Sequence, residues 1–465
     1  MQRRGSFLFT LTACLIFSGC VAERTNEPNN NLASPLPSAT ESPSPEKNRA
    51  SSTQSLTLPV LDAFFADDSF AGTLKTRLQL TDEQVAKLKD LAHSETAKLN
   101  EDNAGTEERE SSTARAAASE KIGALIGPEK TGQLAELVGE LWNSSAGEAA
   151  DKTTPAPNTI PKDSRIVVNI PAYRMDVFDS GRLIKSYKVG IGYPEFPLPI
   201  GSRKAQVIIF NPTWTPPDEP WVAKMKNVAV GEKVAAGSKL NPLGPIKIPI
   251  GGPSLIHGGK SPAKLGTFAS HGCVGLTTPQ VQDFAKLLAQ LGGAELTDAE
   301  LADYARSKTQ TKQVKLEHSV PVELRYETIV VEDGKLHIYR DVYDQGSNTE
   351  DKLRAVLEAN GVRLEDLTEA ERTQALEALA QMSDRSAGGD SKESPSASPA
   401  PKSTSSADRS PNSNKRMTAV AKNQKEIVIE IGALNGKGYP APVAFDTGSG
   451  KTRSTVGPPG KRETP

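Results

Sequence analysis

Three stretches with few large apolar residues divide this chain into separately foldable pieces. They cover residues 20–55, 148–163 and 383–415, and Ser, Pro, Thr, Ala and Asn dominate them. Such segments cannot bury enough apolar surface to offset the entropy lost on ordering the chain. We therefore predict a disordered tether and two linkers there, and we expect folded structure only between them.

The charges of the chain are nearly balanced. The 55 Lys and Arg residues are intermixed with 57 Asp and Glu residues, which gives a formal net charge of -2. No large field of a single sign would attract a polyanion. We expect no nucleic-acid partner, and no cofactor or metal.

The N-terminus has the pattern of an export signal. Arg3 and Arg4 precede an apolar run over residues 7–17. This run is shorter than the roughly 20 apolar residues that a permanent membrane-spanning helix needs. Residues 1–19 are therefore predicted to be a signal peptide.

The signal ends in a motif that indicates lipidation. The sequence "FSGC" at residues 17–20 resembles a bacterial lipobox, in which the cysteine, here Cys20, is lipidated and becomes the mature N-terminus. The alternative is an ordinary cleaved signal with an incidental cysteine. We expect a lipid-anchored protein of the periplasm and cell envelope, and Val21 after the cysteine favours the outer membrane over the inner one.

Helical periodicity surrounds the centre of the chain. We predict a small helical domain at residues 56–147, with no evident chemistry, and a helical segment at residues 347–382. Two capping boxes mark helix starts in these regions: Thr81 with Gln84, and Thr368 with Glu371.

Between these regions, residues 164–346 are predicted to be mainly β. Short apolar runs alternate with turn signals, such as "DSG" at 179–181 and "EDG" at 332–334. One helix is expected within "TTPQVQDFAKLLAQLGG", with Thr278 as its N-cap and Gly292 as its C-terminal cap. Residues 416–465 hold one strand candidate and a basic tail of unknown function.

A glycine-rich segment within the β region gathers the reactive side chains. His257, His271 and Cys273 lie in "IHGGKSPAKLGTFASHGC". Cys273 is the only cysteine after Cys20, so it has no disulfide partner in a compartment that normally permits disulfides. A lone thiol in an exported protein is exposed to oxidation, so its presence is explained by burial, by metal ligation or by reactivity.

Three interpretations of this cluster remain open. Cys273 is a buried small hydrophobe, a zinc ligand with both histidines but no evident fourth ligand, or a thiolate nucleophile with a histidine base. The glycines favour the nucleophile, because Gly272 and Gly275 let the backbone approach a substrate carbonyl closely. A cysteine just ahead of a helix also gains from free N–H groups, which lower its pKa and hold an oxyanion.

The same segment resembles the signature of the L,D-transpeptidase catalytic (YkuD-like) domain. An apolar residue, His and Gly are followed by a spacer and then by Ser-His-Gly-Cys. The resemblance extends over about residues 164–344 and includes "PLPIGSRKAQVIIFNPTWTPP" and "VVEDGKLHIYRDVY". It implies a mainly β, L,D-transpeptidase-like β-sandwich with one or two helices, flanked here by small α-helical regions and disordered linkers.

The resemblance also implies roles for individual residues. Cys273 would be the nucleophile and His257 its general base, oriented by the carbonyl of Gly258. His271 would support the site. The backbone N–H groups of Gly272 and Cys273 are the candidates for the oxyanion hole.

Further positions are candidates for substrate binding. Ser270, Tyr193 and Trp214 would lie at the cleft, although ordinary packing is the alternative for the two aromatic residues. Many members of the family carry Arg or Asn where this chain has Gly275, and an Arg there could hold a carboxylate bidentately. Lys260 in the spacer is either a solvated charge or a partner for carboxylates of a peptide stem.

The function implied by the resemblance is that of a peptidoglycan L,D-transpeptidase. The cysteine would transfer an acyl group from a tetrapeptide stem to an amine, in 3-3 cross-linking or wall attachment. The alternatives are an L,D-carboxypeptidase that hydrolyses the same bond and a non-catalytic wall-binding lipoprotein. The expected partners are peptidoglycan stem peptides and, through the lipid anchor, a membrane.

Overall fold

The computed structural model describes residues 56–99, 111–144, 157–217, 222, 225–383 and 424–449. The predicted signal peptide, Cys20 and the tether lie outside the described residues, as do most of the two linkers and the end of the tail. Within the described part, no helix has the length and apolar character needed to cross a membrane.

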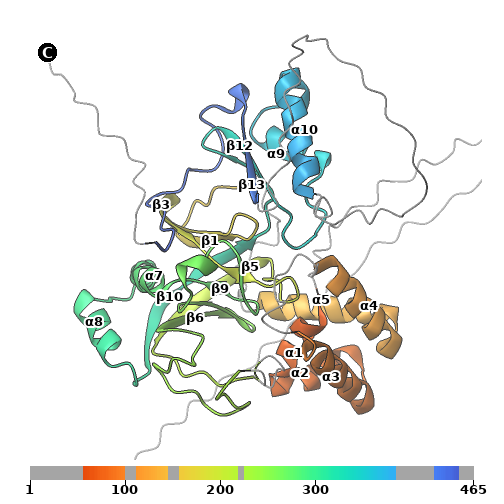
Figure 1. Ribbon diagram of the computed structural model, residues 1–465, viewed down its shortest axis with the longest axis vertical. Coiled ribbons are helices and arrows are strands. Elements are labelled where there is room, and N and C mark those ends of the chain that lie inside the picture. The colour runs from red at the N-terminus through yellow and green to blue at the C-terminus, as the bar shows by residue number, and fades with distance from the viewer. Residues whose placement is uncertain are drawn as a thin grey trace, which may run out of the picture. The chain divides into compact units, whose positions relative to one another are not determined.

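The predicted N-terminal helical domain is present as five helices in the described residues (Figure 1). They are α1 (Leu58–Phe65), α2 (Asp68–Leu78), α3 (Asp82–Thr96), α4 (Ser111–Ile126) and α5 (Pro128–Ser144). The predicted capping box of α3 is confirmed, because Thr81 and Gln84 exchange side-chain to backbone hydrogen bonds. Leu61, Leu74 and Leu134 are fully buried in a core of this domain's own residues.

The centre of the chain is mainly β, as predicted. One sheet of the described residues has the order β3-β2-β1-β10-β5-β6-β7-β9, in which β1 with β10 and β7 with β9 are parallel pairs. Its strands are β1 (Arg165–Asn169), β2 (Arg174–Asp179), β3 (Arg182–Lys188), β5 (Gly201–Phe210), β6 (Ile246–Gly251), β7 (Ser254–His257), β9 (Val274–Gly275) and β10 (Lys312–Arg325). Two further strands, β4 (Ile191–Gly192) and β8 (Phe268–Ser270), pair in parallel with each other.

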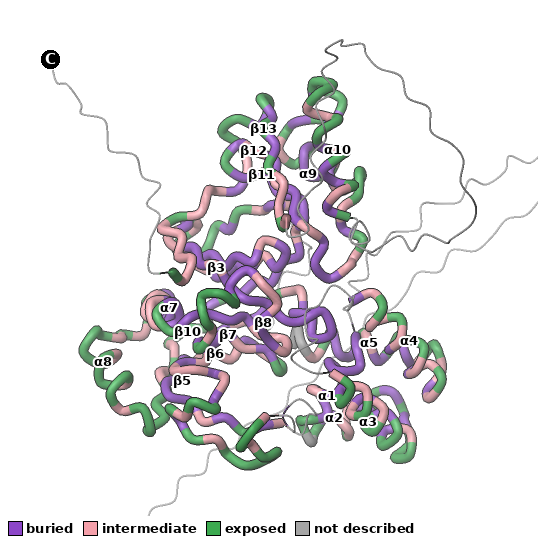
Figure 2. Tube along the Cα trace, in the orientation of Figure 1, coloured by how far each residue is buried: buried purple, intermediate pink, exposed green. Residues whose placement is uncertain are grey.

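Helix α7 (Thr278–Leu291) packs against β6 and β10. Its buried residues Val281, Phe284 and Leu288 contribute to the main hydrophobic core. Figure 2 shows buried stretches of the chain, in purple, around β3 and β8. The N-cap is Thr277 and not the predicted Thr278, because the Thr277 side chain accepts the N–H of Gln280 while Gln280 bonds back to the Thr277 N–H. The predicted C-terminal cap, Gly292, is confirmed.

A second helix follows α7 that the sequence analysis does not predict. Helix α8 (Asp298–Arg306) has no fully buried residue, and its Leu301 and Tyr304 are partly buried against the main hydrophobic core. A capping box of Thr297 and Glu300 starts it.

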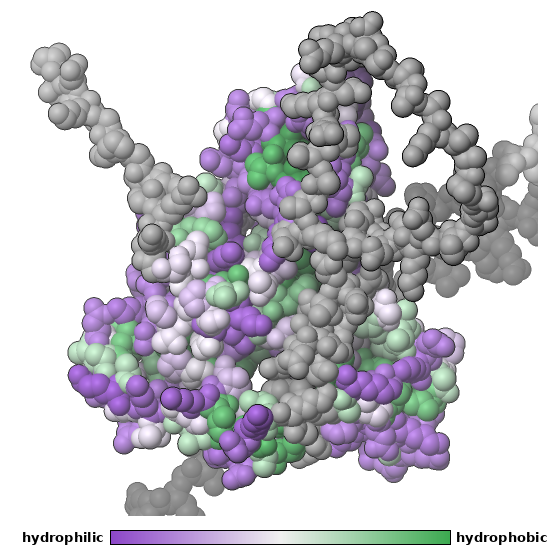
Figure 3. Space-filling model, viewed as in Figure 1, coloured by the Kyte–Doolittle hydropathy of each residue, from purple (hydrophilic) through white to green (hydrophobic). Residues whose placement is uncertain are grey.

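Figure 3 shows mostly hydrophilic residues on the visible face, with hydrophobic residues in small separate patches.

The strands at the end of the predicted catalytic region belong to a different sheet. β11 (Ile329–Glu332) and β12 (Lys335–Tyr339) pair with β13 (Glu426–Glu430) from the C-terminal region. Helices α9 (Glu350–Ala359) and α10 (Glu369–Ser383) pack on this sheet and share a separate core with it. The expected boundary at residue 346 therefore cuts through a small α+β unit that runs from β11 to β13.

Both predicted hairpin turns are confirmed. The first joins β2 to β3 through Ser180 and Gly181, and the second joins β11 to β12 through Asp333 and Gly334. All four residues have positive φ, between 47° and 80°, as a two-residue type I′ turn requires.

The C-terminal segment continues from β13 to the edge of the large sheet. Near β3, the N–H groups of Ser186 and Lys188 donate to the carbonyls of Val443 and Asp446. The Gln280 side chain of α7 also donates to the Asp446 carbonyl, at 2.9 Å. Part of the predicted tail thus protects a sheet edge that would otherwise present unpaired backbone groups.

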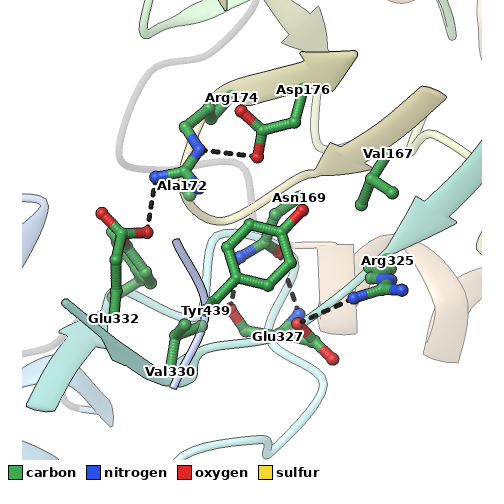
Figure 4. Close-up of a pocket in the computed structure, with 11 residues that line it drawn as sticks. Val167, Asn169, Ala172, Arg174, Asp176, Arg325, Glu327, Val330, Glu332 and Tyr439 are labelled. Carbon is green, nitrogen blue, oxygen red and sulfur yellow. Dashed lines mark hydrogen bonds and ion pairs between the residues drawn. The ribbon is translucent and has the colours of Figure 1, made fainter. Parts of the chain in front are cut away.

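Charged side chains line a small cavity between β1, β2 and the β11–β12 hairpin (Figure 4). Arg174 forms ion pairs with Asp176, at 2.9 Å, and with Glu332, at 2.5 Å. All three side chains are buried. Arg174 and Asp176 belong to β2 and Glu332 belongs to β11, so the cluster joins the large sheet to the small unit. Removing one partner would leave a buried charge unpaired and weaken this junction.

Candidate active site

The strands β7 and β9 bring the predicted base beside the predicted nucleophile. In their parallel pairing, Ile256 lies opposite Val274 and His257 lies opposite Gly275. Neighbouring strands are about 4.8 Å apart. Cys273 immediately precedes β9, so the two residues lie at adjacent strands although the spacer separates them in sequence.

His257 is held as a neutral imidazole. It is 3% exposed, and its Nδ1 lies 2.8 Å from the carbonyl oxygen of Gly258, the carbonyl to which the resemblance points. A carbonyl only accepts, so Nδ1 carries the proton and Nε2 keeps the lone pair. Burial, and next the positive charge of Lys260, lower the pKa of His257 to about 3, while backbone hydrogen bonds at Gly258 and Leu243 act in the opposite direction. The ring is therefore in its proton-accepting form at neutral pH.

The turn at Cys273 is closed by Ser270. The Ser270 hydroxyl donates to the Cys273 carbonyl, at 2.5 Å, and accepts the Cys273 N–H, at 3.0 Å. Ser270 is buried, so its hydroxyl shapes the turn, whereas the sequence analysis expects it to bind substrate. Since the Cys273 N–H already has an acceptor, the N–H of Gly272 remains the candidate for an oxyanion contact.

The thiol itself is partly exposed. Cys273 is the one cysteine among the described residues and forms no disulfide there, and its Sγ lies 4.0 Å from the carbonyl oxygen of Pro253. Helix α7 starts only beyond β9, and the helix dipole acts within about one turn of a helix end. Cys273 therefore lies outside the first turn of α7, where the helix dipole acts most strongly.

His271 is enclosed by aromatic rings. Tyr193 and Phe196 both meet it edge-on, with ring centroids 5.3 Å and 4.8 Å away. Burial, and next the charge of Lys260, lower the pKa of His271 to about 3. Phe196 was missed in the sequence analysis, because a single aromatic residue in a Pro-rich loop has no pattern that marks it.

The space that a side chain at position 275 would fill is taken by Lys260. A Cβ built on Gly275 would lie 2.8 Å from Cγ and 2.9 Å from Cε of Lys260. The Lys260 N–H also donates to the Leu276 carbonyl. The cation at this place therefore comes from Lys260 of the spacer, and position 275 itself carries no side chain.

Trp214 lies in a small apolar cluster with Val222 and Leu243. It is 8% exposed and pairs with Val234 through an isolated bridge. Leu255 of β7 packs against the same cluster. The side-chain contacts described for Trp214 are thus apolar packing contacts, which agree with the alternative of ordinary packing.

No group of three or more His, Cys, Asp or Glu residues in the described ranges is arranged to hold a metal ion.

Comparison with known proteins gives a family match for the part of the chain that holds this site. Residues 163–313 match the family of the L,D-transpeptidase catalytic domain, YkuD. No curated protein matches the chain.

Solved structures give weaker similarities. The NMR structure of the catalytic domain from an E. faecium L,D-transpeptidase is 16% identical, with a TM-score of 0.23, over 36% of this chain and 100% of that one. An L,D-transpeptidase from Mycobacterium smegmatis is 14% identical, with a TM-score of 0.20, over 35% of this chain and 58% of that one. Scores this low carry no argument about this chain.

Proposed function

We propose that this protein is a cysteine-dependent L,D-transpeptidase of peptidoglycan, with residues 163–313 as its catalytic domain. The observation that supports this most is the pairing of β7 with β9, which puts a neutral, oriented His257 on the strand next to the one that Cys273 immediately precedes. This is the arrangement of a nucleophile with an adjacent base that is itself held by a third group. The family match of this region supports the same reaction class.

In the first step, the sulfur of Cys273 attacks the carbonyl that precedes the terminal D-Ala of a tetrapeptide stem. His257 Nε2 accepts the thiol proton and then delivers it to the amine of the leaving D-Ala. The C–N bond breaks and a thioester forms. The Gly272 N–H supports the oxyanion of the tetrahedral intermediate.

In the second step, an amine attacks the thioester. His257 takes a proton from this amine and returns one to the sulfur, which restores the free thiol. An amine of another stem gives a 3-3 cross-link, and a wall-attached or free amine gives the corresponding conjugate. Water in place of the amine would give an L,D-carboxypeptidase.

The reaction is tested with the full chain, a purified tetrapeptide stem and an added D-amino acid. Mass spectrometry of products and intact protein should show exchange of the terminal residue and an acyl adduct on the protein. The adduct should vanish in Cys273→Ala, which changes only the thiol. A product shortened to the tripeptide alone would instead identify a hydrolase.

Unchanged substrate together with unmodified protein would contradict the enzyme proposal. It would favour the non-catalytic wall-binding lipoprotein. Thiol alkylation then separates a reactive from an inert cysteine, because a catalytic thiolate alkylates rapidly near neutral pH.

We further propose that Cys20 is lipidated and anchors the protein to the outer membrane, facing the periplasm. The support is the lipobox-like sequence at residues 17–20. Fractionation of cells should find the protein with membranes, and Cys20→Ala should release it or leave its signal uncleaved. Recovery of the wild-type protein in the soluble fraction would contradict the lipid anchor.

A further inference from the structure

The loop at residues 193–198, "YPEFPL", forms one wall of the candidate site. Besides the two ring contacts with His271, the Tyr193 N–H donates to the Ser270 carbonyl, at 2.8 Å. A Cβ on Gly192, just before the loop, would lie 2.1 Å from the Phe196 carbonyl oxygen and 3.2 Å from the Gly272 nitrogen. Loop and turn are therefore in close backbone contact directly before Cys273.

Two hydroxyls of the helical domain hold this loop from its other side. Thr57, the N-cap of α1, donates through Oγ1 to the Glu195 carbonyl, at 2.6 Å. Ser111, the first residue of α4, donates through Oγ to the Pro194 carbonyl, also at 2.6 Å. Both side chains are completely buried, so water does not compete for these carbonyls.

A third contact from α4 reaches the ends of the same loop. The Arg115 guanidinium donates to the carbonyls of Tyr343 and Asp344, at 2.8 Å and 2.6 Å. The Tyr343 hydroxyl in turn donates to the Gly192 carbonyl, at 2.9 Å, and accepts the Leu198 N–H, at 3.2 Å. Tyr343 thus joins both ends of the loop, and Arg115 fixes the backbone that carries Tyr343.

We propose that the helical domain is a positioning element of the active site, in which Thr57, Ser111 and Arg115 hold the 193–198 loop against His271 and Gly272. Its consequence for turnover rests on the proposed function, while the mechanical link does not. The domain was assigned no chemistry from its sequence. Its role is to keep the backbone before Cys273 in the geometry that the acyl-transfer step needs.

The link is tested with Thr57→Val, Ser111→Ala and Thr57→Ser in the full chain. Thr57→Val and Ser111→Ala each remove one donor and should speed amide hydrogen exchange in residues 193–198 and 270–275. The kcat of D-amino-acid exchange should fall by about threefold to tenfold, the factor that corresponds to one lost hydrogen bond, with KM nearly unchanged. Thr57→Ser keeps the hydroxyl, so its amide hydrogen exchange and its kcat should both match those of the wild type.

The matched control is Thr81→Val. Thr81 is also a threonine N-cap of the helical domain, but its hydroxyl bonds only within α3. The Thr81→Val variant should lower the stability of the helical domain, but it should leave the hydrogen exchange of the loop and the kcat unchanged. Equal behaviour of Thr57→Val and Thr81→Val, or unaltered exchange in the loop, would overturn the proposal. A wild-type chain without exchange activity would refute the proposed function alone, because hydrogen exchange still decides the link.

Discussion

At the residue scale, the site contains two imidazoles that the fold keeps neutral. The pKa of both His257 and His271 is lowered to about 3, whereas an imidazole in the unfolded chain titrates near about 6.5. Between these values the unfolded chain binds protons that the folded chain does not bind. The free energy of unfolding therefore falls as the pH falls through this window, and it is fully retained above about pH 6.5.

This linkage predicts the behaviour of His271→Phe. The variant keeps an aromatic ring between Tyr193 and Phe196 but loses one titrating group. We expect a shallower loss of stability between about pH 6.5 and pH 4 than in the wild type, measured by urea unfolding at several pH values. Parallel curves for the two proteins would contradict the prediction.

The contact between Gly275 and Lys260 predicts a coupled pair of substitutions. Gly275→Ala places a methyl group against the Lys260 stem, so we expect a destabilisation of about 1–3 kcal/mol from overpacking. Lys260→Ala opens that space, so the double variant should recover most of the loss. Thermal unfolding of the two single variants and the double variant measures the coupling, and strictly additive effects would refute it.

Lys260 also sets the electrostatics of the site. Its charge is the second cause that lowers the pKa of His257, after burial. Lys260→Met should therefore raise the pKa of His257 and shift the acidic limb of the pH profile of kcat/KM to higher pH. If Lys260 meets a carboxylate of the stem, KM should rise as well, and a profile identical to the wild type would contradict both expectations.

At the element scale, the turn from Ser270 to Cys273 depends on one side chain. Ser270→Ala leaves the N–H and carbonyl of Cys273 without their hydroxyl partner, which should cost about 1–3 kcal/mol and lower kcat. Ser261→Ala is the matched control, because Ser261 lies in the spacer before Ser270 and its side chain makes no cap hydrogen bond. Equal unfolding midpoints and rates for both variants would contradict the role of this turn.

Elements with a complete local signal were predictable, and elements without one were not. The capping boxes at Thr81 and Thr368 and the "DSG" and "EDG" turns specify their own geometry through neighbouring residues. Helix α8 also has a capping box, but it is short and none of its residues is fully buried, and it was missed.

At the scale of the whole molecule, the C-terminal segment completes the fold. β13 and the residues after it contribute Ile429, Ile431 and Leu434 to the core of the small α+β unit. Deleting residues 424–465 should destabilise this unit by several kcal/mol, since each buried aliphatic side chain contributes about 2–5 kcal/mol. Unfolding and dye binding to exposed apolar surface measure the effect.

The control for this truncation is a deletion of residues 450–465 only. That chain keeps β13 and the backbone contacts of Asp446 with β3. Its unfolding should match the wild type. Similar losses in both truncations would show that the described segment is not what stabilises the unit.

The sequence alone determined the positions of the main helices and turns, and it marked the candidate reactive residues. These follow from patterns within a few residues of each other: the Ser-His-Gly-Cys run, the caps and the apolar periodicity. It did not determine which strands share a sheet: β11 and β12 were assigned to the same β region as the large sheet, but they form a separate sheet with β13, which had no assigned partner. Pairing between distant strands depends on backbone hydrogen bonds that any sequence makes, and only the folded chain shows which of them form.

The tertiary structure likewise decided the surroundings of Cys273. Ser270 turned inward to close a turn, Lys260 filled the space beside Gly275, and Phe196 came to lie against His271. The contacts from Thr57 and Ser111 join residues more than eighty positions apart. Such contacts arise when segments distant in the sequence pack together, and no local pattern in the sequence encodes them.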